Sequence, residues 1–207
     1  MGRPRGTSRG WRERQERDPY VQKARKEGWR SRAVYKLEEI DRKIRLLKPD
    51  MVVVDLGAAP GSWSQYVTER LKGRVRIVAV DLLPMDSLPA VEFVQGDFTD
   101  DETLAELNAA IGDDRVDLVM SDMAPNISGS RAVDQPRSMY LAELALDMCR
   151  EVLAKGGDFV CKLFQGEGID AFIAETRLLF GSVKVMKPKA SRAGSREVYL
   201  VARNYQI

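Results

Sequence analysis

The chain has 207 residues, 44% of them hydrophobic and 31% charged, which suits one soluble α/β domain with a short appendage. It contains no histidine, and this excludes His-based acid–base catalysis, Ser-His-Asp triads and His-ligated metals. No apolar run approaches the ~20 residues of a membrane helix. We therefore expect neither a membrane span nor a metal site, and any proton transfer must use Lys, Asp, Glu, Tyr or Cys.

The net charge of +2 conceals an uneven distribution along the chain. Residues 1–32 carry eleven Lys and Arg against four Asp and Glu, a local net of +7, so the remaining 22 basic and 27 acidic residues sum to −5. A second basic cluster contains Lys184, Lys187, Lys189, Arg192 and Arg196, with no acid among them. Charge sorted in this way favours a polyanionic partner. A solvated basic tail is the alternative for residues 1–15.

Cysteine use indicates the compartment. Cys149 and Cys161 lie within apolar runs and are predicted to be buried free thiols, which a reducing cytosol maintains. We therefore expect a cytoplasmic protein. An Arg-rich N-terminus also suits a mitochondrial address, but Glu13, Glu16 and Asp18 weaken that alternative.

The N-terminal part is expected to be basic and partly helical. Residues 1–17 mix Gly, Arg, Ser and Pro and are predicted to form a flexible basic arm. Asp18-Pro19 then begins a helix, since Asp caps helices and Pro fits the first turn. Apolar residues recur at helical spacing, with a break near Gly28, and define a basic helical segment over 18–48. We expect one domain over residues 18–207.

Short β-branched runs alternate with helical patterns over the rest of the chain. The predicted strands are Met51–Asp55, Val75–Val80, Val91–Val94, Val116–Met120, Phe159–Phe164, Val183–Met186 and Val198–Val201. The predicted helices are 63–71, 104–111, Pro136–Leu153, which Gly156-Gly157 would stop, and Ile169–Leu179. This alternation predicts a doubly wound, mostly parallel α/β sheet. The last two strands leave no room for a helix between them, so one of them is expected to be antiparallel.

The first predicted strand ends in Asp-Leu-Gly57-Ala-Ala-Pro60-Gly61, at the edge where doubly wound sheets bind ligands. This turn lacks the G-x-G-x-x-G spacing of dinucleotide sites, and Pro60 intrudes where a pyrophosphate would need a free helix N-terminus. S-adenosylmethionine has no phosphate, so Gly57 and Gly61 suit this cofactor. An ordinary strand–helix turn is the alternative.

Acidic residues end the next two predicted strands. Asp81 lies about twenty residues beyond the glycine turn, where doubly wound folds place an acid on a ribose diol. Asp97 follows the third strand, where it could meet an adenine amino group. Each alone could be an ordinary loop acid. A nicotinamide oxidoreductase would use an acid at the same point, but the missing G-x-G-x-x-G disfavours it.

Two further features concern the acceptor. Asp122-Met-Ala124-Pro-Asn126 follows the fourth strand, where amino-directed methyltransferases carry an Asp/Asn-Pro-Pro-aromatic motif that holds a planar amine. Ala124 and Asn126 depart from that motif, so an amino substrate is disfavoured.

Lys162 lies among apolar residues of the fifth strand, where a buried charge needs a partner. The alternative is that the aliphatic part of this side chain extends along the sheet and its ammonium reaches solvent at the edge.

Several stretches closely resemble the FtsJ/RrmJ family of large-subunit ribosomal RNA uridine 2′-O-methyltransferases. They are S-R-A-V-Y-K-L-E-E-I, V-D-L-G-A-A-P-G-S-W-S-Q-Y, D-L-L-P-M-D, Q-G-D-F, S-D-M-A-P-N-I-S-G, V-C-K-L-F-Q-G-E-G and S-R-A-G-S-R-E-V-Y, and the resemblance runs from about Asp18 to the end. It implies a Rossmann-like fold of the S-adenosylmethionine-dependent methyltransferase type. The implied catalytic tetrad is Lys36, Asp122, Lys162 and Glu197. The implied cofactor residues are Gly61, Trp63, Asp81, Asp97 and Asp122. Ser62 replaces a glycine that many members carry.

The resemblance also implies an activity: S-adenosylmethionine-dependent methylation of a uridine 2′-hydroxyl in 23S ribosomal RNA of the assembled 50S subunit. We expect a monomer in which Lys162 acts as the base, or only steers a hydroxyl lone pair, with Asp122 orienting it. The basic cluster near the C-terminus and a helix are expected to grip RNA phosphates. That helix carries Lys23, Arg25, Lys26, Arg30 and Arg32. A non-catalytic RNA-binding assembly factor is the alternative.

Overall fold

The computed structural model describes residues 17–192 and 194–207, so the predicted basic arm lies almost entirely outside the described residues. The fold is a seven-stranded sheet in the order β3-β2-β1-β4-β5-β7-β6. Its strands are β1 (Met51–Leu56), β2 (Val75–Asp81), β3 (Val91–Gln95), β4 (Val116–Ser121), β5 (Leu153–Phe164), β6 (Phe180–Met186) and β7 (Glu197–Tyr205). Pairing is parallel from β3 to β5, and β7 is antiparallel to both β5 and β6. The predicted doubly wound, mostly parallel sheet with an antiparallel strand near the C-terminus is confirmed.

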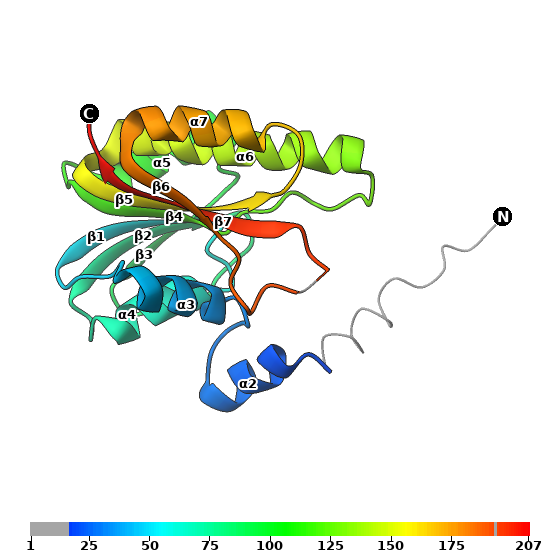
Figure 1. The fold of residues 1–207 in the computed structure, drawn as a ribbon. Coiled ribbons are helices and arrows are strands. Elements are labelled where there is room, and N and C mark those ends of the chain that lie inside the picture. Colours follow the sequence, from blue (N-terminus) through cyan, green and yellow to red (C-terminus); the bar gives the residue numbers. More distant parts are fainter. Residues whose placement is uncertain (1–16, 193) are drawn as a thin grey trace.

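Helices cover both faces of the sheet (Figure 1). They are α2 (Pro19–Glu27), α3 (Val34–Ile44), α4 (Ser62–Arg70), α5 (Asp101–Ile111), α6 (Arg131–Val152) and α7 (Ile169–Leu179). Helices α5, α6 and α7 pack on one face, and α3 and α4 on the other. Each central strand therefore buries both of its sides. In β1, Val54 belongs to the core under α5 and α6, whereas Val53 belongs to the core over α3 and α4. Such two-sided burial explains why these strands are continuous apolar runs.

Three predicted boundaries were wrong. Helix α2 ends at Glu27, because Gly28 adopts a left-handed φ of 78° and caps it, so Arg30 and Arg32 lie beyond the helix. Helix α6 begins at Arg131 rather than at Pro136, which lies in the second turn and removes only one backbone donor there. Strand β5 begins at Leu153 rather than at Phe159.

Strand β5 begins immediately after α6, at Leu153, and contains the glycine pair that was predicted to stop the helix. The register with β4 shifts between Val116 and Leu118, so residues 154–157 form an irregular insertion in the strand. Gly156 accommodates this irregularity with a φ of 87°. The glycine pair that was predicted to stop the helix therefore marks a bulge in β5.

Other expectations concern membranes, metals and thiols. No helix in the described part of the chain is long and apolar enough to cross a membrane. Among the same residues, no group of three or more Cys, Asp or Glu side chains is arranged to hold a metal ion. Cys149 and Cys161 are free and buried, as predicted. Burial raises the pKa of the Cys161 thiol to about 12, so this group is a packing element.

Candidate active site

The topology brings four chain segments together at one end of the sheet. Asp122 directly follows β4, and Lys162 lies near the end of the parallel neighbour β5. Because β7 runs antiparallel to β5, its first residues reach the same end, where Glu197 pairs with Phe164. Lys36 enters from the first turn of α3, which covers this face. Residues that are up to 161 positions apart in sequence therefore converge.

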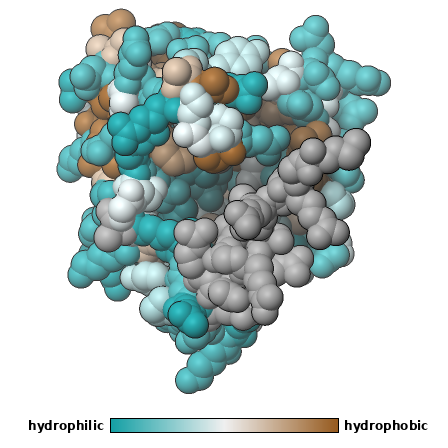
Figure 2. Space-filling model, turned by 90° about the vertical axis from the view of Figure 1, so that its right-hand side faces the viewer, coloured by the Kyte–Doolittle hydropathy of each residue, from teal (hydrophilic) through white to brown (hydrophobic). Residues whose placement is uncertain are grey.

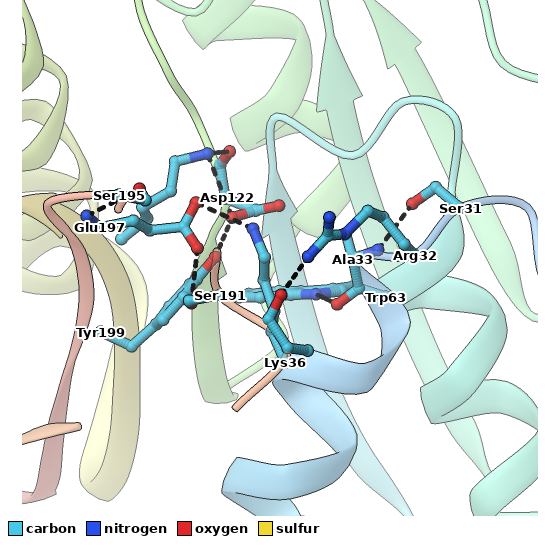
Figure 3. Close-up of polar contacts among 12 residues, drawn as sticks. Ser31, Arg32, Ala33, Lys36, Trp63, Asp122, Ser191, Ser195, Glu197 and Tyr199 are labelled. Atoms are coloured by element: carbon cyan, nitrogen blue, oxygen red, sulfur yellow. Dashed lines mark hydrogen bonds and ion pairs between the residues drawn. The ribbon is translucent and has the colours of Figure 1, made fainter. Parts of the chain in front are cut away.

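The converging side chains form two ion pairs (Figure 3). Lys162 Nζ lies 3.2 Å from Asp122 Oδ1 and donates to the backbone carbonyl of Asp122 at 2.5 Å. Lys36 Nζ lies 2.9 Å from Glu197 Oε2. Tyr199 links the pairs, since its hydroxyl donates to Asp122 Oδ1 at 2.6 Å and its ring centroid lies 5.6 Å from Lys36 Nζ. The four residues of the predicted tetrad thus form one connected cluster.

Hydrogen bonds fix the outer member of the cluster. Ser191 Oγ donates to Glu197 Oε1 at 2.7 Å, and the Glu197 backbone N–H donates to Ser195 Oγ at 3.1 Å. Both carboxylate oxygens of Glu197 are therefore engaged. Arg192 and Arg32 join the cluster residues in lining a cavity of about 200 Å³ beside the Lys36–Glu197 pair. A polar ligand that enters this cavity would meet a predominantly cationic wall.

The surroundings of Asp122 favour its ionised form. Burial on its own would raise the pKa of this carboxyl, but the charges of Lys162 and Lys36 and the Tyr199 hydroxyl outweigh burial and lower it. Tyr199 shows the reverse: burial and the neighbouring carboxylates raise the pKa of its phenol well above the ordinary value. The phenol therefore stays protonated and can keep donating to Asp122.

A glycine turn borders the cluster on the β1 side. The backbone N–H of Asp122 donates to the carbonyl of Leu56, the last residue of β1, at 3.2 Å. Gly57 follows with a φ of 77°, and Gly61 has a φ of 98°. A Cβ at Gly57 would lie 2.6 Å from Met123 Cγ, and one at Gly61 would lie 2.7 Å from Met85 Sδ. Only glycine fits these positions without a shift of its neighbours.

Beneath the turn lies a buried acid that lacks a full set of partners. Asp55 is 1% exposed, accepts from Ser64 Oγ at 2.6 Å through Oδ2, and has no partner for Oδ1. Burial, despite the opposing hydrogen bond from Ser64 and with help from the charges of Asp122 and Asp81, raises the pKa of this carboxyl to about 7. Perturbed acids of this kind cluster at functional sites, and Asp55 lies at the end of the sheet that carries the cluster.

The two loop acids lie on the far side of the turn. Asp81 accepts from the backbone N–H of Ala59 at 2.9 Å and from that of Leu83 at 2.8 Å, so it ties the glycine turn to the end of β2. Asp97 accepts from the backbone N–H and hydroxyl of Thr99, and these contacts lower its pKa. Each of these carboxylates retains acceptor capacity beyond these bonds.

Comparison with known proteins identifies the family. Residues 29–205 match the model of the FtsJ-like methyltransferases. The chain belongs to this family. A solved structure from Plasmodium falciparum, assigned as a ribosomal RNA methyltransferase, superposes with a TM-score of 0.78 at 31% sequence identity. The match covers 86% of this chain and 98% of that one. The resemblance inferred from the motifs is therefore confirmed, and the Rossmann-like sheet is that of an FtsJ-like methyltransferase.

Within this methyltransferase, the predicted site residues occupy different kinds of position. Lys36, Asp122, Lys162 and Glu197 come together, but their catalytic roles stay predictions. Trp63 is 2% exposed, and its indole N–H donates to the carbonyl of Ala33 at 2.9 Å. This contact fixes the start of α3, which carries Lys36. The predicted contact of Trp63 with the cofactor stays a prediction.

Sequence reasoning missed several members of the site. Tyr199 is fully buried and packs against Trp63 with ring centroids 5.7 Å apart, so it supports both ion pairs from below. The signal was available, because Glu197 and Tyr199 are two residues apart and must point to the same face of a strand. Ser191 left no such signal, since it lies in a loop whose path no periodicity predicts. Asp55 was read only as part of a motif.

The residues around the glycine turn fit S-adenosylmethionine. This cofactor has a cationic methionine part and an adenosine with a ribose diol, and it needs close approach of the backbone. Gly57 and Gly61 provide positions that a Cβ would fill, and Asp55 Oδ1 is a buried acceptor without a protein partner. Asp81 and Asp97 add carboxylates at the neighbouring strand ends. The donor and acceptor set therefore agrees with the expected cofactor.

The close approach at Gly57 gives a testable prediction. Gly57→Ala combines an unfavourable φ with a Cβ that overlaps Met123, so we expect a loss of about 2 kcal/mol in unfolding free energy and weaker binding of S-adenosylmethionine. Gly73→Ala is the matched control, since Gly73 has a φ of 74° and open space around its Cα. Thermal unfolding and calorimetric titration measure both effects. Equal affinity for the cofactor in the two variants would contradict the prediction.

Proposed function

We propose that this FtsJ-like methyltransferase transfers a methyl group from S-adenosylmethionine to a uridine 2′-hydroxyl of 23S ribosomal RNA in the assembled large subunit. The observation that carries the proposal is the Lys162–Asp122 pair, held against the end of β1 where the glycine turn begins. The assignment of the Plasmodium falciparum relative as a ribosomal RNA methyltransferase supports the choice of substrate. We further propose a cytoplasmic monomer.

The arrangement suits a hydroxyl acceptor. S-adenosylmethionine, when bound, supplies a methyl group that its sulfonium already activates, so the protein must position the acceptor and remove one proton. A lysine ammonium has three N–H donors, and Asp122 uses two of those on Lys162. The third can hold the ribose oxygen. Asp122 Oδ2, which has no bond within the described residues, can accept a hydrogen bond from the ribose hydroxyl and so orient it, while Lys162 takes the proton or steers the lone pair. Placement of this kind supplies roughly 7–11 kcal/mol of a reaction barrier.

The same contacts oppose an amino acceptor. A planar amine presents two hydrogens and is held best by two acceptors in one plane. The carbonyl of Asp122 already accepts from Lys162, and its Oδ1 accepts from Tyr199. One oxygen is therefore left, which is enough for a hydroxyl. This geometry supports the inference drawn from Ala124 and Asn126.

The RNA-binding surface differs in detail from the one expected from sequence. Arg30 donates to the backbone carbonyls of Pro60, Asp86 and Ser87, so it stabilises the loops instead of facing solvent. Arg32 pairs with Asp18 and binds the carbonyl of Ala190. The exposed cations of the two predicted basic groups include Arg25, Lys26, Lys184, Lys189 and Arg192. We propose that these groups contact phosphates.

A phosphate-based interface predicts a strong salt dependence. About four phosphate contacts correspond to a fall in RNA affinity of roughly 10²-fold between 50 and 200 mM salt. Charge removal at Lys26 and Lys189 should weaken binding uniformly across RNA sequences and reduce the slope of the log–log plot by about 1 to 2. Fluorescence anisotropy with a labelled ribosomal RNA fragment measures both quantities. An affinity that does not change with salt, or a slope that does not change with these substitutions, would exclude the interface.

The test of the proposed function is methyl transfer itself. Purified protein, radiolabelled S-adenosylmethionine and large ribosomal subunits that lack the modification should yield labelled RNA, and mapping should place the mark on one uridine 2′-oxygen. Free 23S RNA should be a poorer substrate. A methyl group on a base would overturn the choice of acceptor. RNA binding without any transfer would favour the non-catalytic assembly factor.

A further inference from the structure

A second cavity lies beside the catalytic cluster, since Arg196 directly precedes Glu197 and Phe164 is the cross-strand partner of Glu197. It has a volume of about 300 Å³ and is lined by residues of three chain segments: Ile127, Arg131, Asp134, Gln135, Phe164, Gly194 and Arg196. None of these residues belongs to the tetrad or to the glycine turn. Figure 2 views the molecule from the side on which β7 begins, and hydrophobic side chains reach the surface there above a hollowed centre. The cavity therefore belongs to the end of the sheet that carries the cluster.

Its position is fixed by strand register. Phe164 lies two residues beyond Lys162 on β5, so both side chains are on the same side of the sheet, about 7 Å apart along the strand. Phe164 is also the cross-strand partner of Glu197. If the ribose oxygen of a nucleotide contacts Lys162, the base of that nucleotide is far enough from Lys162 to reach Phe164 and the cavity.

Part of the wall is apolar. Ile127 and Phe164 line the cavity, and Ile127 is 63% exposed. Its loop is held in place by Asp134, whose Oδ1 accepts from the backbone N–H and hydroxyl of Ser128, both at 2.8 Å. The exposed apolar surface is therefore presented on an anchored loop, a feature typical of binding sites.

A buried polar atom of the cavity wall also lacks a partner. The side-chain nitrogen of Gln135 donates to the carbonyls of Phe164 and Glu167, both at 3.0 Å, which fixes the orientation of the amide. Its Oε1 has no hydrogen-bond partner among residues 17–192 and 194–207, although Gln135 is only 7% exposed. An unsatisfied buried acceptor costs about 1–3 kcal/mol. A ligand with an N–H donor would relieve that cost.

The cavity also carries positive charge. Arg131 is exposed at the start of α6, and the Arg196 guanidinium donates to the carbonyl of Gln165 at 3.1 Å; both arginines line the cavity. A wall with two apolar side chains, an amide and two arginines matches a nucleobase with its flanking phosphates. The Asp134 carboxylate, which lines the same cavity, disfavours a phosphate alone.

From these observations we propose that the cavity lined by Ile127, Phe164 and Gln135 binds the base of the nucleotide that is methylated, after that base has left its stack. The proposal rests on the proposed function, since it assumes an RNA acceptor at Lys162. Ile127 and Phe164 supply the apolar contact with the ring, and Gln135 Oε1 supplies an acceptor for a base N–H. Extrusion of a base into a protein pocket is the general solution for enzymes that modify stacked nucleotides.

The test compares two RNA probes of equal charge: a decauridylate and a decamer of the same length that consists of abasic ribose phosphates. Wild-type protein should bind the decauridylate about tenfold more tightly, since contact of a base with a protein ring contributes on that scale. Ile127→Ala should reduce this ratio to about twofold and lower methyl transfer to ribosomal RNA about tenfold. Its exposure makes a folding defect from this truncation small, and thermal unfolding checks that.

Leu178→Ala is the matched control, because Leu178 is 80% exposed on α7 and lies outside the cavity lining. It should leave the binding ratio and methyl transfer unchanged. An unchanged ratio in Ile127→Ala, with methyl transfer intact, would overturn the base pocket and leave the proposed function standing. A reduced ratio in Ile127→Ala, with no methyl transfer by wild-type protein to any RNA, would overturn the proposed function and leave only a base-binding cavity.

Discussion

Lys162→Ala is expected to reduce methyl transfer by about 10²- to 10⁴-fold while leaving S-adenosylmethionine affinity within about twofold of wild type. The reason is geometric. Lys162 Nζ is the donor that Asp122 holds in place through its carbonyl and its Oδ1, and the Lys162 side chain is only 8% exposed. Without it, nothing in the cluster holds the ribose oxygen. Single-turnover kinetics with radiolabelled cofactor, and calorimetric titration for binding, measure the two quantities separately.

A second substitution at the same position separates the two roles of this lysine. Arginine donates hydrogen bonds but does not release a proton near neutral pH. If Lys162 only steers the hydroxyl, Lys162→Arg should keep a measurable fraction of the rate. If Lys162 is the base, the Lys162→Arg variant should be as slow as Lys162→Ala. Lys155→Ala, which removes an exposed lysine at the other end of β5, serves as the control. Near-wild-type turnover of Lys162→Ala would remove this residue from the mechanism.

Asp55→Asn is expected to change the pH dependence of folding stability by about 4 kcal/mol between pH 4 and pH 8. The folded protein raises the pKa of this carboxyl from 3.8 to about 7, chiefly through burial. Between about pH 4 and pH 7 this carboxyl is ionised in the unfolded chain but still protonated in the folded protein. Wild-type stability therefore falls as the pH rises from about 4 to 7 and then levels off. The shift of about three pKa units corresponds to about 4 kcal/mol, an upper value for a buried group.

Asparagine cannot ionise, so this loss is absent in the variant. Denaturant unfolding of both proteins at several pH values gives the difference in unfolding free energy between them. Only the change of this difference with pH is interpreted, because any cost of the new amide is the same at every pH. Asp113→Asn alters an exposed carboxylate and controls for net charge. A difference that stays constant from pH 4 to pH 8 would show that Asp55 ionises normally in the folded protein.

Much of the fold was predictable because its signals are local. The strand runs around Val53, Val78 and Val119 are β-branched and apolar, since these strands are buried on both faces. Asp18 and Pro19 marked the start of α2 correctly, because an N-cap and a first-turn proline act within a few residues. The order of strands with helices between them then left a doubly wound parallel sheet as the natural arrangement.

The failures occurred where a local signal has two meanings. Pro136 marks the first turn of many helices, but here it lies inside α6, and the tertiary packing of the helix outweighs the one lost backbone bond. The glycine pair after α6 marks a helix end or a strand bulge equally well, and only pairing of β5 with β4 decides between them. A local pattern cannot contain information about a partner strand that lies far away in sequence.

For the candidate site, the sequence alone indicated which chemical groups are available for catalysis. The absence of histidine, the glycine turn after β1 and the isolated charge of Lys162 in an apolar strand limited the chemistry to lysine and carboxylates. The contacts between those groups came from the tertiary structure. Lys36 and Glu197 meet because β7 reverses direction beside β5, and Tyr199 connects the two ion pairs only in that arrangement. The cavity beside Phe164 likewise exists only when three distant segments pack, because a concave surface is a property of packed side chains and not of any one segment.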